Sequence, residues 1–187
     1  MKRDHARELF DLRPDGALRV VVVADTHSRP DPRSADLIAA QRPDRILHAG
    51  DIGAPDVLAA LAVHAPVTAV RGNIDARMPG LPDVVTIDVR EGDRTLVTLL
   101  LLHIAVYGPK LRADAARLAR AAEASIVVCG HSHVPFLGRD QGIAVINAGS
   151  IGPRRFRLPI VFGVIDIDRD HVSMHHVSCE TGDRWLP

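Results

Sequence analysis

The chain has 187 residues, in which 23 lysine and arginine residues balance 23 aspartate and glutamate residues, and it contains ten histidines. A net charge of zero excludes an overall field that would attract nucleic acid or an anionic membrane, so any charge specificity must be local. We predict one domain over residues 1–187, with residues 1–17 as an N-terminal extension.

The first 75 residues repeat an apolar strand, a polar loop and a helix. Strands are predicted in 18–28, 45–51 and 67–73, and helices in 33–43 and 54–66. The four consecutive valines 20–23 suit a strand that is buried on both faces. This alternation is typical of right-handed parallel crossovers.

The second half of the chain is richer in strands. A hairpin is predicted from 83–89 and 94–103, an amphipathic helix in 108–124, and further strands in 125–130, 136–140, 143–149 and 160–178. We therefore expect an α/β fold: a four-layer α/β/β/α sandwich of two mixed sheets with helices outside. Loops after the strand ends should gather along one rim.

Polar residues follow five of the predicted strands. They are Asp25, His27, Asp51, Asn73, Asp75, His103, His131 and His133. Singly, each has an ordinary explanation as a turn residue or a hydrogen-bonded side chain. Asp25 with His27, and His131 with His133, are two residues apart, so on an extended chain each pair points to one face. The pattern as a whole predicts a metal site.

The motifs DTH, GD and GN, a lone histidine after a long strand, and GHSH occur in this order over residues 25–133. They resemble the motifs of the calcineurin-like metallophosphoesterases, in particular the small single-domain bacterial and archaeal branch, and residues 147–155 resemble the loop that follows. The resemblance implies that one divalent ion binds Asp25, His27, Asp51 and His133. It implies a second ion on Asp51, Asn73, His103 and His131, with Asp51 bridging.

Such a site suits a phosphate ester, because two divalent ions outweigh two carboxylates and a bridging hydroxide in charge. We predict a phosphoesterase, preferably a phosphodiesterase, in which the metal-bridging hydroxide attacks phosphorus. Asp51, Asn73 and Asp75 are the candidate catalytic residues, with Asp75 orienting a neighbouring ligand. Mixed oxygen and nitrogen ligation favours manganese, with iron, zinc, cobalt or nickel as alternatives.

The chain departs from the family pattern after the third strand. Many members have Gly-Asn-His there, and this histidine is thought to protonate the leaving group, whereas here the sequence is Gly72-Asn73-Ile74. Acid catalysis contributes roughly 100- to 10,000-fold. We therefore expect weak turnover of alkyl phosphates and better turnover of nitrophenyl-type diesters.

Two arginines are candidates for substrate binding. Arg154 and Arg155 carry guanidinium groups that match a phosphate oxygen pair, although a solvated basic loop is the alternative interpretation. The remaining histidines are assigned structural places. His5, His64, His171, His175 and His176 are expected at the surface or on edge strands, and His48 inside a strand or behind the ligands.

Two other functions remain open at this stage: a protein-interaction scaffold resembling the retromer subunit of this fold, and a metal-binding regulatory protein without turnover. The expected partner is a small phosphate ester. Scattered aromatic residues weigh against nucleic acid. The apolar run 160–167 is expected to form an edge strand, which favours a homodimer.

The sequence also predicts a cytoplasmic protein that does not enter the membrane. The first 16 residues lack an apolar segment, and the longest apolar run, 98–108, is too short for a bilayer. Two cysteines, Cys129 and Cys179, do not make a disulfide framework.

Overall fold

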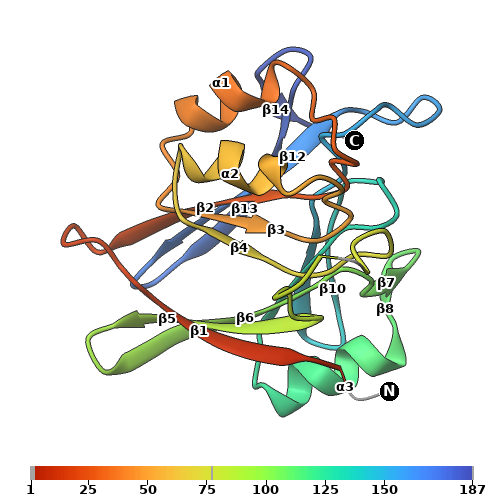
Figure 1. Cartoon of the computed structure of the whole chain (residues 1–187). Helices are drawn as coiled ribbons and strands as arrows, with labels where there is room; N and C mark the ends of the chain where they lie inside the picture. Colours follow the sequence, from red (N-terminus) through yellow and green to blue (C-terminus); the bar gives the residue numbers. More distant parts are fainter. Residues whose placement is uncertain (1–2, 77, 187) are drawn as a thin grey trace.

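Two six-stranded sheets pack face to face within residues 3–76 and 78–186, the part of the chain that this computed structural model describes (Figure 1). The first sheet has the order β1 (His5–Asp11), β5 (Val84–Glu91), β6 (Arg94–Leu102), β9 (Ile126–Cys129), β11 (Ile143–Asn147), β10 (Phe136–Asp140). The second has the order β14 (Arg184–Trp185), β13 (Val172–Ser178), β12 (Val161–Asp168), β2 (Ala17–Val23), β3 (Arg45–His48), β4 (Val67–Ala69). Both sheets mix parallel and antiparallel pairs.

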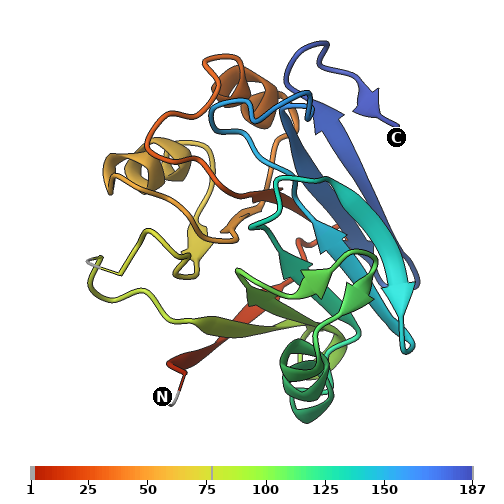
Figure 2. The ribbon, with the colours of Figure 1, turned by 90° about the vertical axis from the view of Figure 1, so that its right-hand side faces the viewer.

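The helices cover the outer faces of the two sheets. Helices α1 (Ser34–Ala40) and α2 (Asp56–Ala62) share an apolar cluster with the second sheet, and α3 (Ala113–Ala121) shares one with the first. Figure 2 shows α3, in green, on the opposite side of the molecule from α1 and α2, in orange. The predicted four-layer sandwich is confirmed.

The valine run in β2 shows why both faces of this strand are apolar. Val20 and Val22 point into the cluster between the two sheets, whereas Val21 and Val23 pack with the residues under α1 and α2. Successive side chains of a strand point to opposite faces, so a central strand between two cores must be apolar at every position.

Strands β2, β3 and β4 run parallel, so their carboxyl ends lie at one edge of their sheet. Strands β6, β9 and β11 also run parallel to one another in the facing sheet. The loops that follow β2, β3, β4, β6 and β9 carry the predicted ligands. The arrangement therefore gathers them at one rim, as expected for ligand sites in open α/β sheets.

Residues 5–11 form β1, within the segment that the sequence suggested as an N-terminal extension. This edge strand pairs in parallel with β5, and Phe10 is buried between the sheets with 3% exposure. Most of its other side chains face solvent. Its polar composition therefore gave no strand signal, although the strand belongs to the fold.

Two further expectations from the sequence are wrong. The helix expected in 108–124 begins only at Ala113, because residues 106–111 form a small ribbon of β7 (Val106–Tyr107) and β8 (Lys110–Leu111) that turns at Gly108, where φ is +56°. Strand β12 lies between β13 and β2 rather than at an edge. The argument for a homodimer through 160–167 therefore fails. Throughout the described ranges, each helix is too short or too polar to cross a bilayer.

Candidate metal centre

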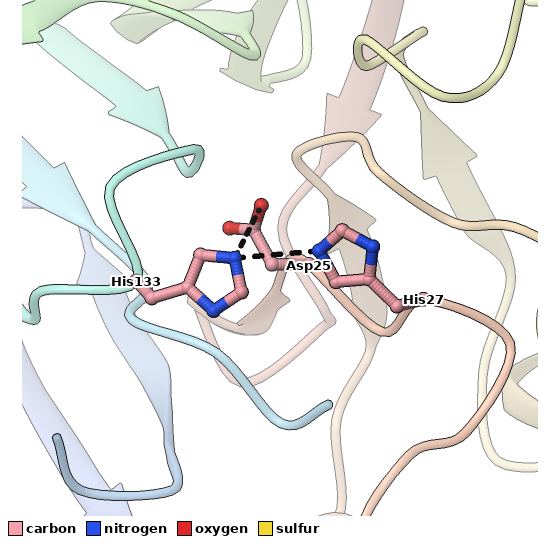
Figure 3. A group of neighbouring side chains, drawn as sticks. All are labelled: Asp25, His27 and His133. Carbon is pink, nitrogen blue, oxygen red and sulfur yellow. Dashed lines mark hydrogen bonds and ion pairs between the residues drawn. The ribbon is translucent and has the colours of Figure 1, made fainter. Parts of the chain in front are cut away.

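Asp25, His27 and His133 form the first group of candidate ligands, although they come from loops more than 100 residues apart (Figure 3). One ligand atom from each lies within 4.8 Å of the others. His133 Nε2 is 3.5 Å from Asp25 Oδ1 and 3.3 Å from His27 Nε2. A carboxylate and two imidazoles thus converge on one small volume.

Asp25, Asp51 and His103 form a second group with the same 4.8 Å limit. Asp51 Oδ1 lies 3.3 Å from His103 Nε2, and Asp51 Oδ2 lies 3.8 Å from His27 Nε2. The two oxygens of Asp51 therefore face histidines of different groups, as a bridging carboxylate requires. Asp25 also belongs to both groups, which the sequence did not suggest.

His131 and Asn73 lie at the exposed edge of the second group. The His131 ring packs edge-on against His103, with centroids 5.1 Å apart, and the His131 backbone N–H donates a 2.8 Å hydrogen bond to Asp25 Oδ2. Asn73 lines the same surface hollow as His103. Both residues are thus neighbours of His103, and His131 lies outside the two tight clusters.

The protonation of His103 tests whether this donor set fits a cation. His103 Nδ1 can only donate to the Ala49 carbonyl oxygen, 2.7 Å away, so a neutral ring carries its lone pair on Nε2. That nitrogen and Asp25 Oδ1 are buried and have no hydrogen-bond partner among the described residues. Nε2 also faces an acceptor oxygen of Asp51 at 3.3 Å. Such opposed lone pairs fit a divalent cation, and the backbone contact is the usual support of a ligating imidazole.

Burial sets the charge of the donor atoms. It lowers the pKa of His133 to about 4, with a further contribution from Arg155, and it lowers the pKa values of His27 and His103. The imidazoles are therefore neutral near pH 7, as metal ligation requires. Burial and the nearby Asp51 raise the pKa of Asp25 to about 8. A bound cation would favour the ionised carboxylate and reverse that shift.

The backbone is left-handed rather than extended at five of the seven predicted ligands. The φ values are +54° at Asp25, +46° at His27, +55° at Asp51, +72° at His131 and +59° at His133. The argument that residues two apart on an extended chain share a face is therefore wrong. Sharp turns after the strand ends aim these side chains inward. Such conformations cost about 1–3 kcal/mol each and cluster at functional sites.

Asp75 ties together the loops after β3 and β4. Its carboxylate accepts backbone N–H groups from Ile52 at 3.1 Å, Gly53 at 3.0 Å and Gly72 at 2.8 Å. These bonds fix the two residues that follow Asp51 and join them to the loop after β4. Asp75 is buried, with 2% exposure, so it lies behind the ligands and supports them through the backbone.

Comparison with known families identifies the domain. A sequence model described as the calcineurin-like phosphoesterase superfamily domain matches residues 18–170. The chain belongs to this family. Its metal-dependent chemistry agrees with the two groups of ligand-type side chains in this phosphoesterase domain.

Individual relatives agree with this assignment. A probable metallophosphoesterase from Methanothermobacter thermautotrophicus is 32% identical over 156 residues, which cover 81% of this chain and 87% of the relative. Vps29 from Entamoeba histolytica, solved in complex with Zn²⁺, superposes with a TM-score of 0.72 at 21% identity, over 90% of this chain and 96% of that one. The Escherichia coli phosphoesterase YfcE gives a TM-score of 0.60 at 18% identity, over 90% and 97%. The last two show a shared fold.

His48 and Thr26 form a buried support beneath the phosphoesterase site. Gly50 N–H donates to His48 Nδ1 at 3.2 Å, so His48 Nε2 donates to Thr26 Oγ1 at 3.0 Å, which in turn donates to the Ile52 carbonyl oxygen at 2.9 Å. This series of hydrogen bonds joins the DTH loop to the GD loop. The prediction of His48 inside a strand is confirmed, whereas Thr26 was missed because a lone threonine carries no signal in the sequence.

We expect His48 to make the metal-free protein sensitive to acid. Burial lowers its pKa from 6.5 to about 3. Between these values the unfolded imidazole binds a proton that the folded one does not, so this residue should contribute a loss of about 1.4 kcal/mol of stability per pH unit as the pH falls. Urea unfolding at pH 7, 6, 5 and 4 in chelator measures the slope. His48→Gln should give a shallower decline, and equal slopes would contradict the assignment.

Asn147 and His176 support the GHSH loop from behind. The Asn147 amide donates to the Gly130 carbonyl oxygen at 2.7 Å and to Ser132 Oγ at 3.2 Å, and His176 Nε2 donates to the Asn147 carbonyl oxygen at 2.7 Å. The surface assignment of His176 is therefore wrong, since it is 2% exposed. His5 and His171 are exposed, and His64 and His175 are half-buried.

The two candidate substrate-binding arginines point to different places. Arg155 Nη2 lies 3.2 Å from His27 Nε2, at the mouth of the first group. Arg154 instead donates to the Leu158 carbonyl oxygen at 3.0 Å and pairs with Glu180. The Arg154 guanidinium is therefore engaged by Leu158 and Glu180. Of the two arginines, only Arg155 reaches the site.

Proposed function

We propose that the chain is a phosphodiesterase that uses two divalent ions, with manganese as the expected metal. The proposed ligands of one ion are Asp25, His27, Asp51 and His133, and those of the other are Asp51, Asn73, His103 and His131. The observation that best supports this proposal is the position of Asp51. Its two carboxylate oxygens face His103 and His27 at 3.3 and 3.8 Å. When bound, the ions would activate water and offset the negative charge that develops on the phosphoryl group.

The side chains of the site divide the remaining work. Neutral imidazoles donate lone pairs, and Asp75 holds the backbone that follows Asp51. The Arg155 guanidinium, beside His27, is suited to hold a non-bridging phosphate oxygen. Asn73 is exposed next to His103, where its amide would contact both the metal and the ester.

The proposal is tested by metal analysis and hydrolysis on one preparation. The protein is purified without chelator, its metal content is measured, and bis(p-nitrophenyl) phosphate is assayed with and without added manganese. We expect up to two ions per chain and a rate that depends on them. Full occupancy without hydrolysis of this diester would contradict the phosphodiesterase and favour a binding protein.

The residue at position 74 should decide which leaving groups are accepted. Ile74 is 50% exposed beside the site, and its N–H donates to Asp51 Oδ1 at 3.2 Å. Ile74→His would supply a proton donor there, and we expect it to speed hydrolysis of alkyl phosphodiesters by about 100-fold or more. Bis(p-nitrophenyl) phosphate, with its good leaving group, should change little. Equal gains on both substrates would contradict this role.

A protein-interaction role is the second candidate. Large apolar side chains are exposed on the loops around the site, among them Phe156 at 93% and Ile74 at 50%. Exposed apolar side chains on such loops are available for contact with a partner protein. This reading gains support only if the diester assay fails with both metal positions filled.

A further inference from the structure

An apolar hollow of about 420 Å³ adjoins the second group of ligands. The loops after β6 and β9 form it, and His131 belongs to its wall together with Ile104, Tyr107, Val134 and Phe136. Ligand pockets in proteins have volumes of about 300–1,000 Å³ and are lined mainly by apolar and aromatic groups. This hollow has the size and the lining of such a pocket.

Tyr107 is held in place without being used by the core. Its side chain is 85% exposed, whereas Ala105 and Leu111, at the two ends of the β7–β8 ribbon, are buried in the cluster under α3. The ribbon backbone is thus anchored while the ring is presented to solvent. Val134, on the opposite loop, is 46% exposed. Tyr107 and Val134 therefore line one hollow, together with Ile104 and Phe136.

A second hollow, of about 340 Å³, lies on the other side of His103. Its lining mixes the apolar Leu102 and Ile104 with Asn73 and with Arg71, whose guanidinium pairs with Asp83 at 3.2 Å. Ile104 lines both hollows and lies between them. The second metal group is therefore flanked by two depressions, which suits an ester with two substituents better than a monoester.

We propose that the hollow at Tyr107 binds an apolar, planar substituent of a phosphodiester while the phosphate lies over the metal ligands. This inference rests on the proposed function and adds a substrate class: diesters with an aryl or similarly flat group on one arm. Tyr107 and Val134 are then specificity-determining residues, and the ring of Tyr107 stacks on the bound group.

Tyr107 is the only tyrosine of the chain, so it can be observed alone. Protein labelled with 3-fluorotyrosine and loaded with zinc, which is diamagnetic, should give one ¹⁹F signal. We expect diphenyl phosphate to shift this signal saturably and dimethyl phosphate to leave it unchanged. No shift with diphenyl phosphate, or the same shift with both esters, would overturn the proposal.

Variants measure the contribution of the ring by titration calorimetry. Tyr107→Ala should raise the Kd of diphenyl phosphate about three- to tenfold, and Tyr107→Phe should restore it, because the aromatic face is kept. Val63→Ala, at an 82% exposed apolar position after α2, is the matched control and should have no effect. An unchanged Kd in Tyr107→Ala would overturn the subsite.

These binding measurements separate the two proposals. Selective binding of diphenyl phosphate without hydrolysis of any ester would contradict the proposed function and support the subsite. Hydrolysis of bis(p-nitrophenyl) phosphate with equal affinity for aryl and dimethyl esters would overturn the subsite alone.

Discussion

Asp51→Asn is expected to lower metal-dependent diester hydrolysis by at least about 100-fold, more than the typical loss of a residue that only supports a ligand. Asp51 is the side chain whose oxygens face histidines of both groups. Asparagine tolerates the left-handed backbone and keeps an oxygen for the Ile74 N–H, so the fold should persist. Metal content and kcat/KM for bis(p-nitrophenyl) phosphate should fall together.

Asp93→Asn is the matched control for this substitution. Asp93 is exposed in the turn between β5 and β6, on a hairpin that lies outside the candidate site. The same loss of one negative charge there should leave metal content and rate unchanged. Full activity in Asp51→Asn would contradict the assignment of Asp51 as the shared ligand.

Asp75→Ala is expected to lower the free energy of unfolding by about 3–5 kcal/mol, because it leaves buried backbone N–H groups without acceptors. The carboxylate serves Ile52, Gly53 and Gly72, so no single remaining group can replace it. Asp75→Asn keeps one acceptor oxygen and should lose less. Urea unfolding in the presence of chelator separates this effect from metal binding.

A control and a second readout accompany this measurement. Asp93→Ala, at an exposed turn, should change stability by less than about 0.5 kcal/mol. Where Asp75→Asn folds, it should retain part of its activity, since Asp75 touches no predicted ligand side chain. A loss below about 1 kcal/mol in Asp75→Ala would contradict the structural role.

The layers of the fold could be predicted because the central strands are marked by apolar runs. Val20 to Val23 fill two cores at once, and the β5–β6 hairpin shows a turn between two apolar segments. Edge elements carry weaker signals. Strand β1 buries little besides Phe10, and the β7–β8 ribbon has two residues per strand. Strand β1 forms by pairing with the distant β5, and β7 by pairing with the adjacent β8. Backbone pairing, rather than side-chain periodicity, creates both structures.

The ligand-type residues could be found from their order after the strands, but their geometry could not. Nothing in the pair His175-His176 tells which ring is buried, because that depends on Asn147, 29 residues away from His176. Likewise Arg154 and Arg155 are neighbours, and only the fold turns one toward Glu180 and the other toward His27. These outcomes depend on contacts between distant segments.

The left-handed turns also restrict which amino acids can occupy the ligand positions. Among residues with a side chain, Asn, Asp and His are the types most enriched at positive φ, and the five predicted ligands that have positive φ are all Asp or His. Loop conformation and metal coordination thus favour the same residue types, Asp, Asn and His. A relative that no longer binds ions is therefore expected to keep Asp, Asn or His at these turns for their backbone conformation. Metal content, rather than the motif residues, then distinguishes an active enzyme from an inactive relative.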